Sequence, residues 1–455
     1  METKVYERIK YEKEDILKLL RNKEYVKLRE YLNETNEVDI AEVIGELENP
    51  LYCLLIFRML PKKSASAVFA YLDLDSQINI MDSISEKEIK EILDELFFDD
   101  IIDMIEEMPA EFVTLILKHI SREERSLVNQ FLKYPEDSVG SLMTIEYAAF
   151  NKNYTVGRAL EYLHNIGAKK ENIYSSYIVG NNNKLIGIVS LRKLVTSDLD
   201  AKMEDIMEED VIYLSTDDDQ EFASDIFKKY GFISMPVVDD TNKLVGIVTV
   251  DDILHVMEEE DTEDFQKMAA IIPTDDEYLD TNPLKLAKNR IPSLLILLFS
   301  ATISGFIINS NLNILGKFGV LSTLMPMLTD TGGNAASQSS TLVIRGLSTG
   351  DVKEKDVPKI LLKELKVSVI IAFVLVFVIL FRVLILENEG IKIALTIIFT
   401  LMVTVFSSNI VGGILPILAE KVGLDPATVA VPVITTVVDA LSLLIYFEIA
   451  KSILL

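Results

Sequence analysis

The chain has 455 residues, 49% of them hydrophobic, with 71 acidic and 44 basic side chains and a net charge of −27. One cysteine and three histidines exclude a disulfide scaffold and argue against a Cys/His zinc site, so a metal would need oxygen ligands, which suit Mg²⁺ or Ca²⁺. Residues 289–455 hold 11 acidic and 12 basic residues, which leaves 60 and 32 in residues 1–288. This acidic part excludes nucleic acid as a partner and favours divalent cations.

Residues 1–135 predict an acidic, all-α domain. The N-terminus METKVYERIKYEKEDI lacks the apolar core of a secretory signal. Apolar residues then recur at three-to-four spacing, as in SEKEIKEILDELFFDDIIDMIEEM, which predicts a superhelical stack of short helices. Pro50, Pro61 and Pro109 each stand near an expected helix start, where proline is tolerated.

An internal repeat occupies residues 138–257. YIVGNNNKLIGIVSLRKL (177–194) parallels PVVDDTNKLVGIVTVDDI (236–253), and both read strand, polar turn, strand, helix. Upstream, GSLMTIEYAAFNKNYTVGRALEYL (140–163) parallels EDIMEEDVIYLSTDDDQEFASDIF (204–227). The two α+β units, residues 136–200 and 201–257, resemble a tandem pair of CBS domains, which are ligand-sensing modules rather than enzymes.

Residues 258–288 predict a linker that ends the acidic part. EEEDTEDFQKMAAI has a dense acidic start and an amphipathic body, so we expect a helix that joins the sensor to the segments after it.

Residues 289–455 predict a five-helix transmembrane domain. Each apolar stretch has about the 20 residues that a bilayer-spanning helix needs. The stretches are too long and too poor in charge for the alternative, a buried helical bundle. They cover residues 291–314, 316–347, 361–386, 391–419 and 427–454.

The distribution of basic residues predicts the orientation in an inner or plasma membrane. Six lysines and arginines lie in and around the connection between the second and third stretches, at Arg345, Lys353, Lys355, Lys359, Lys363 and Lys366. The positive-inside rule then places the N-terminus in the cytoplasm, and five spans leave the C-terminus outside.

The second stretch contains MPMLTDTGGNAASQSSTLVIRGL (325–347), which is too polar for a lipid-facing helix. Pro326, Gly332 and Gly333 permit a break, and broken backbone at membrane depth is tolerated where it lines a cavity. The alternative is a tightly packed helix contact with no solute path.

Asp439 lies near the middle of the fifth stretch, one turn after Thr435 and Thr436. An aspartate in hydrocarbon is costly and faces a water-filled path or a partner. The central parts of the five stretches carry no basic residue, so a passing cation is the natural counter-charge. The alternative is a protonated aspartate that is hydrogen-bonded to threonine or serine.

The order of these parts, with TDTGGNAASQSSTLVIRGLSTGD (329–351) and GLDPATVAVPVITTVVDALSLLIYF (423–447), resembles the MgtE family of magnesium channels and transporters. The resemblance implies a homodimer in membrane lipid with a Mg²⁺ pore on its axis and Asp439 as the pore aspartate. The carbonyl of Thr435 would line the same site, and the second span would contribute Asn334, Ser337 and Thr341. Ser337 and Val431 stand where better-known relatives carry asparagine.

The resemblance also implies that cytosolic Mg²⁺ binds the acidic portion and closes the pore through the linker helix. Gly231 and His255 stand where relatives carry acids. The implied sensing residues are Asp99, Asp103, Asp219, Glu221, Asp252, Glu260, Glu263, Asp264 and Asp425.

A second ligand, ATP or another adenine nucleotide, is implied by the likeness to CBS pairs. The usual ribose contact is an aspartate three residues after a serine or threonine at a strand end. Thr249 and Asp252 keep this pattern, whereas Ser190 is followed by Arg192 and Lys193. The nucleotide residues implied are therefore Ser190, Arg192, Thr249 and Asp252.

Our main interpretation is a Mg²⁺-selective import channel, closed by cytosolic Mg²⁺ and not an enzyme. A pathway that also passes Mn²⁺, Co²⁺ or Ca²⁺ is a close alternative. An anion channel is disfavoured by Asp439, and a membrane-bound hydrolase by the absence of G-x-S-x-G and H-E-x-x-H patterns. A CBS-domain Mg²⁺ sensor that does not transport remains a further alternative.

Overall fold

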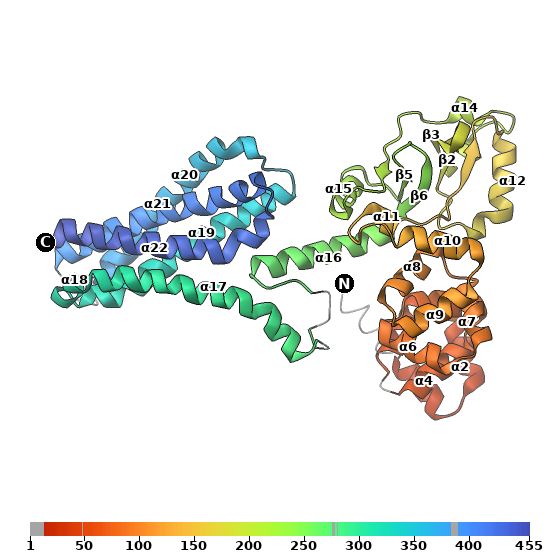
Figure 1. Ribbon diagram of the computed structural model, residues 1–455, viewed down its shortest axis with the longest axis horizontal. Coiled ribbons are helices and arrows are strands. Elements are labelled where there is room, and N and C mark those ends of the chain that lie inside the picture. Colours follow the sequence, from red (N-terminus) through yellow and green to blue (C-terminus); the bar gives the residue numbers. More distant parts are fainter. Residues whose placement is uncertain (1–12, 48, 275–277, 280, 384–389) are drawn as a thin grey trace. The chain divides into compact units, whose positions relative to one another are not determined.

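The computed structural model describes residues 13–47, 49–274, 278–279, 281–383 and 390–455. The chain divides into two compact units, Met1–Met257 and Glu258–Leu455. Figure 1 traces them by colour, red to green for the first unit and green to blue for the second. Each is described by itself.

The N-terminal part of the first unit is a run of short helices, as the sequence predicts. Pro50 opens α4, and Pro61 and Pro109 immediately precede α5 and α9. Ser85 and Ser121 cap α7 and α10 through reciprocal bonds with the glutamate three residues later. The helices are α2 (Tyr25–Glu34), α3 (Glu37–Gly45), α4 (Pro50–Met59), α5 (Lys62–Ala70), α6 (Leu74–Ser83), α7 (Glu86–Leu93), α8 (Phe98–Glu107), α9 (Ala110–His119) and α10 (Arg122–Phe131).

Two matching three-stranded sheets follow, which confirms the predicted repeat. In each, the first strand is parallel to the second, and the second is antiparallel to the third. The first repeat holds α11 (Val139–Leu142), β1 (Ala149–Asn151), α12 (Val156–Ile166), β2 (Ser175–Val179), β3 (Leu185–Ser190) and α13 (Leu191–Thr196). The second holds α14 (Met203–Ile206), β4 (Leu214–Ser215), α15 (Gln220–Tyr230), β5 (Ser234–Val238) and β6 (Leu244–Thr249).

The two repeats are interlocked. The backbone N–H groups of Thr144 and Ile247 each donate to the other residue's carbonyl, at 2.8 and 2.9 Å. The buried Tyr177 hydroxyl lies 3.1 Å from Ser234 Oγ. One apolar core also extends from the N-terminal helices to β5 and β6, whereas the sheet of the first repeat has a core of its own.

Helix α16 (Val250–Met268) begins directly after β6 and continues through the boundary between the units. The linker predicted over residues 258–288 is therefore only partly one helix. Its start is the second half of α16, which ends at Met268, and its last residues, from Pro283, belong to α17 (Pro283–Ser310). Helix α16 ends before Ala270, which has a positive φ of 60°.

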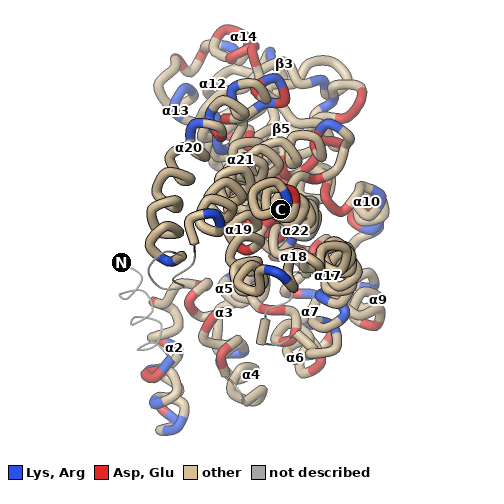
Figure 2. Tube along the Cα trace, turned by 90° about the vertical axis from the view of Figure 1, so that its left-hand side faces the viewer, with Lys and Arg blue, Asp and Glu red and all other residues tan. Residues whose placement is uncertain are grey.

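The second unit is helical. Its helices are α17 (Pro283–Ser310), α18 (Leu312–Lys317), α19 (Val320–Ser348), α20 (Val357–Phe381), α21 (Ile391–Lys421) and α22 (Pro426–Leu454). Charged residues are sparse along α19, α21 and α22 in Figure 2. Four segments of the described chain have the length and hydropathy to cross a membrane: Pro283–Ser310, Glu354–Phe381, Ile391–Lys421 and Val433–Leu454. The predicted end of the third span, at residue 386, falls outside the described residues.

Helix α19 has the length of a span, but its centre is polar. The break that Pro326 and the Gly332–Gly333 pair would permit is absent, because α19 is continuous from Val320 to Ser348. Pro326 lies inside the helix, where its ring removes one backbone hydrogen bond without ending α19.

Glycines allow α19, α21 and α22 to pack closely. A Cβ on Gly332 would lie 2.8 Å from both Ser442 Oγ and Thr404 Cγ2. A Cβ on Gly412 would collide with the backbone oxygen of Ala336. These contacts give α19 one buried face and determine which of its polar residues remain outside.

Candidate functional site

Polar residues follow the outer face of α19. Asn334 and Thr341 are exposed and Ser337 is half-buried, and their spacing of three and four residues places them on one side. Asp330 is exposed one turn earlier, whereas Ala336 is fully buried. A single chain therefore leaves this polar stripe (Asp330, Asn334, Ser337 and Thr341) uncovered by its own bundle.

Asp439 lies beside the same stretch of α19. A Cβ on Gly333 would lie 4.0 Å from Asp439 Oδ1. Asp439 and Thr435 are both half-buried on α22. The basic residue of α22 that forms a described ion pair, Lys451, contacts Glu448 at 2.7 Å in the last turns of the helix. The side chains at 429–432, which include Val431, lie outside the described residues.

The buried side of α19 uses its polar residues for packing. Ser339 Oγ donates to the Asn409 carbonyl at 3.2 Å. Asn409 Nδ2 donates to Ser368 Oγ at 3.0 Å, and Ser368 Oγ donates to the Glu364 carbonyl at 2.7 Å. This chain joins α19, α20 and α21, so the packing interpretation accounts for this face of α19 but not for the polar stripe.

In the first unit, acidic residues from three segments lie close enough to interact electrostatically. We call them the carboxylate cluster. Helix α8 contributes three, the first repeat two and the start of α16 two: Asp99, Asp100, Asp103, Glu146, Glu171, Asp251 and Asp252. The sequence predicted Asp99, Asp103 and Asp252 as sensing residues. It missed Asp100, Glu146, Glu171 and Asp251, since only tertiary contact brings them together.

Burial and mutual repulsion disfavour ionisation in this cluster. Burial, followed by the neighbouring acids, raises the pKa of Glu171 to about 8 and places the pKa of Asp99 well above its usual range. Burial raises the pKa of Asp100 to about 6. Asp99 Oδ1 and Glu171 Oε2 are buried oxygens without a hydrogen-bond partner. The cluster is therefore short of positive charge and of donors.

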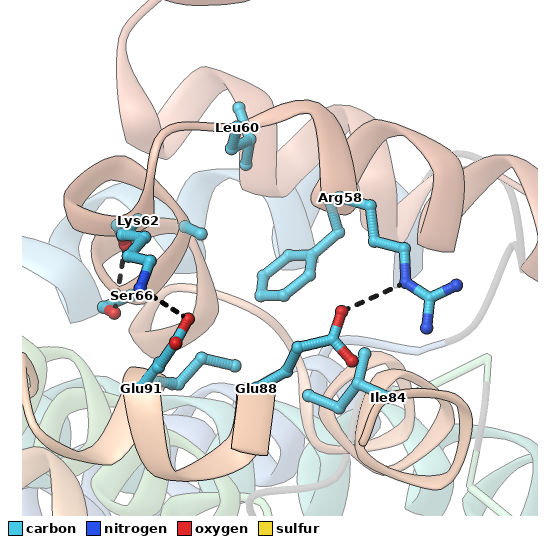
Figure 3. Close-up of a pocket in the computed structure, with 10 residues that line it drawn as sticks. Arg58, Leu60, Lys62, Ser66, Ile84, Glu88 and Glu91 are labelled. Carbon is cyan, nitrogen blue, oxygen red and sulfur yellow. Dashed lines mark hydrogen bonds and ion pairs between the residues drawn. The ribbon is translucent and has the colours of Figure 1, made fainter. Parts of the chain in front are cut away.

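Some acids elsewhere in the same unit are paired with bases. Figure 3 shows a cavity of about 280 Å³ lined by residues of α4, α5 and α7. There, Lys62 Nζ lies 2.8 Å from Glu91 Oε2, and Arg58 Nε lies 3.4 Å from Glu88 Oε1. Hydrogen bonding to Lys62 lowers the pKa of Glu91. The carboxylate cluster differs because its acids face other acids.

The remaining predicted sensing residues are divided between two places. Asp219 caps α15, where its Oδ1 accepts a 2.8 Å bond from the Glu221 N–H. In the second unit, Lys267 Nζ lies 2.8 Å from Glu263 Oε1 and 2.9 Å from Asp425 Oδ2. Asp264 and Glu260 belong to the same half of α16. A lysine thus already occupies the space between the linker acids and α22.

The predicted nucleotide residues do not form one site. Ser190 and Arg192 line a cavity of about 760 Å³ between the repeats, together with Tyr174, Phe232 and Asp210. Thr249 Oγ1 instead donates to Asp252 Oδ2, and Asp252 belongs to the carboxylate cluster. A phosphate chain beside that cluster would meet like charge, so the cavity is the better candidate.

Across the described residues, no three His, Cys, Asp or Glu side chains are arranged to hold a bare metal ion. The carboxylate cluster would offer carboxylate oxygens as ligands, and two of these oxygens are buried and have no hydrogen-bond partner. Such a set fits Mg²⁺ that keeps most of its water, because Mg²⁺ dehydrates reluctantly and is held by one or two carboxylates.

The apolar helices of the second unit define a multi-pass membrane protein, and the comparisons agree. Residues 35–137 match the MgtE intracellular N domain, 139–200 and 203–259 match the CBS domain, and 325–449 match the MgtE family, described as divalent cation transporters.

Full-length relatives carry the same arrangement. The chain is 34% identical over 432 residues to the magnesium transporter MgtE of Thermus thermophilus, covering 94% of this chain and 95% of the relative. It is 32% identical to the magnesium transporter MgtE of Bacillus subtilis, covering 91% and 94%. The chain belongs to the MgtE family, which is a transporter family and not an enzyme class.

Two solved structures resemble the first unit. The soluble part of a magnesium transporter aligns with a TM-score of 0.51 at 27% identity, covering 55% of this chain and 99% of that one. The cytosolic domain of the Mg²⁺ channel MgtE in complex with ATP aligns with a TM-score of 0.50 at 34% identity, covering 53% and 98%.

Proposed function

We propose that the protein is a homodimeric channel that imports Mg²⁺ across the plasma membrane, with its N-terminus in the cytoplasm and its C-terminus outside. The observation that carries the proposal is Asp439, placed beside an uncovered polar stripe of α19. A second copy would cover that stripe and bring two Asp439 carboxylates to one axis. Thr435, Asn334, Ser337 and Thr341 would contribute oxygens to the same path. The names of the relatives support Mg²⁺ as the ion.

The carboxylate cluster supports control by cytosolic Mg²⁺. Without a cation its acids repel one another, and they share at least two unpartnered oxygens. Mg²⁺ would neutralise them and favour the state in which α8, the first repeat and the start of α16 pack together. The ion would thereby close the path by population shift. Asp219, Glu221, Glu260, Glu263, Asp264 and Asp425 remain proposed sensing residues on the family pattern alone.

ATP or another adenine nucleotide would bind in the cavity lined by Ser190 and Arg192. Its volume suits a ligand of that size, and a guanidinium suits a phosphate. A relative of the first unit has been solved with ATP.

The test is Mg²⁺ influx into proteoliposomes loaded with a Mg²⁺-sensitive dye, at micromolar and millimolar internal Mg²⁺. We expect wild-type influx that falls at high internal Mg²⁺, and none from Asp439→Ala. Unchanged influx from Asp439→Ala would move the path elsewhere. No influx from folded wild-type protein would favour a sensor without transport, and equal competition by Mn²⁺, Co²⁺ or Ca²⁺ would favour a broader divalent pathway.

A further inference from the structure

The second unit contains three carboxylates around one ammonium group, at the junction of the linker helix with the last long helix. Lys267 Nζ lies within ion-pair distance of Glu263 on its own helix and of Asp425 immediately before α22. Asp264 also interacts electrostatically with both Asp425 and Lys267. Their elements are α16 and the first residues of α22, both within Glu258–Leu455.

The geometry points to Lys267 as a built-in cation that takes the place of a divalent ion between the linker helix and α22. This inference rests on one part of the proposed function, control by cytosolic Mg²⁺, and narrows it. Glu263 and Asp425 are removed from the proposed sensing residues, because Lys267 neutralises them. The lysine ammonium is a compact point charge on a flexible stem. It lies 2.8 and 2.9 Å from two carboxylates on separate elements, which is the position that a bridging cation would occupy.

Neighbouring contacts hold the lysine in this position. Its side chain is only 23% exposed. Met268, the next residue, packs against Ile344 of α19 and Ala427 of α22. Asp425 is itself fixed, because its Oδ1 accepts a 2.7 Å bond from the Ala427 N–H and caps α22. The ammonium group therefore has little freedom to leave, and a divalent ion would have to displace it.

One consequence concerns which acids bind metal. With Lys267 in place, Glu263 and Asp425 have their positive partner at any Mg²⁺ concentration. The attachment of the linker helix to α22 is then independent of Mg²⁺, and Mg²⁺ sensing belongs to other carboxylates of the chain. Replacement of Lys267 by a neutral residue should create a metal site where the wild type has none.

The experiment counts Mn²⁺ bound to the full-length protein in detergent micelles, by the electron paramagnetic resonance signal of the free ion. Mn²⁺ is a suitable probe because carboxylate sites accept it in place of Mg²⁺. We expect Lys267→Gln to bind one more Mn²⁺ per chain than the wild type, or to bind it at about tenfold lower concentration, because a repelling charge is removed. Lys267→Arg keeps the charge and should match the wild type.

Two double variants test where the additional Mn²⁺ binds. Glu263→Gln and Asp425→Asn, each combined with Lys267→Gln, should remove the additional Mn²⁺, and asparagine still caps α22. Lys359→Gln removes the Lys359–Asp356 pair and serves as the matched control, with no gain expected. An isotherm of Lys267→Gln that overlies the wild type would overturn the proposal, as would a loss of Mn²⁺ from Glu263→Gln alone. Neither result depends on Mg²⁺ influx, so the transport proposal is tested separately.

Discussion

Thr249 Oγ1 donates a 2.6 Å hydrogen bond to Asp252 Oδ2 at the end of β6. The two side chains that were expected to meet a ribose therefore satisfy each other. Asp252 also lies among the acids of α8, where burial raises its pKa. The end of β6 in the second repeat therefore lies beside carboxylates, whereas the end of β3 in the first repeat lines an open cavity.

This division predicts how nucleotide binding responds to substitution. Arg192→Ala should weaken ATP binding by about tenfold or more, since a hydrogen bond to a charged group contributes about 1.5–3 kcal/mol. Thr249→Ala should change it by less than about twofold, because Thr249 does not line the cavity. Isothermal titration of ATP into the full-length protein measures both. Loss of binding on Thr249→Ala would place the nucleotide beside the carboxylate cluster instead.

The carboxylate cluster predicts a pH-dependent stability. The pKa of Asp100 is about 6 and that of Glu171 about 8 in the folded chain, whereas unfolded aspartate and glutamate titrate near 4. Between about pH 4 and 8 the folded state therefore binds more protons, so stability falls as the pH rises. In EDTA, we expect the first unit to unfold about 2–4 °C lower at pH 8 than at pH 6, the shift that about 1 kcal/mol produces.

Magnesium should reverse that trend, because it binds the ionised carboxylates. Added Mg²⁺ should raise the unfolding temperature more at pH 8 than at pH 6. Glu171→Gln should stabilise the protein at pH 8 without Mg²⁺, and Glu91→Gln, an acid that is paired with Lys62, is the control. An unfolding temperature that rises from pH 6 to pH 8 in EDTA contradicts the assignment.

The contact of Gly412 with α19 predicts a large effect from one methyl group. A Cβ there would collide with the Ala336 carbonyl oxygen, whereas a Cβ on Gly305 would meet nothing within 4 Å. Gly412→Ala should destabilise the second unit by about 1–3 kcal/mol. Gly305→Ala should be neutral or stabilising, because alanine is the better helix former. Thermal aggregation in detergent compares the two, and equal behaviour would show that α19 and α21 separate easily.

The uncovered polar stripe of α19 predicts where two chains meet. Cys53 is the one cysteine of the sequence and is buried, so Cys53→Ser gives a clean background. In that background, Asn334→Cys should form a covalent dimer with a short bis-maleimide in membranes. Ser340→Cys, on the buried face of the same helix, should not. Equal yields from the two positions would argue against a two-fold axis at the stripe.

The sequence predicts the helices and strands better than the tertiary contacts between them. The spacing of apolar residues and the positions of prolines are local signals. They are enough to predict the short helices before α10, both repeats and the apolar helices. Asp100, Glu146 and Glu171 have no such signal, because they meet only when α8 packs against the first repeat. Pro326 leads to a wrong expectation. It predicts a break in the helix, but packing along α19 outweighs the effect of the proline and the helix continues.

Helix α16 has its first turn in the second repeat and its last turn at Lys267, with no interruption between them. Its two ends are therefore related by a rotation as well as by a length, because each residue advances a helix by about 100°. One alanine inserted after Met257 would rotate Glu263 and Lys267 by about 100° about the helix axis relative to the first turns of α16. Seven inserted residues would restore the angle to within about 20° while lengthening the helix. Rotational phase and distance can thus be varied independently along this helix.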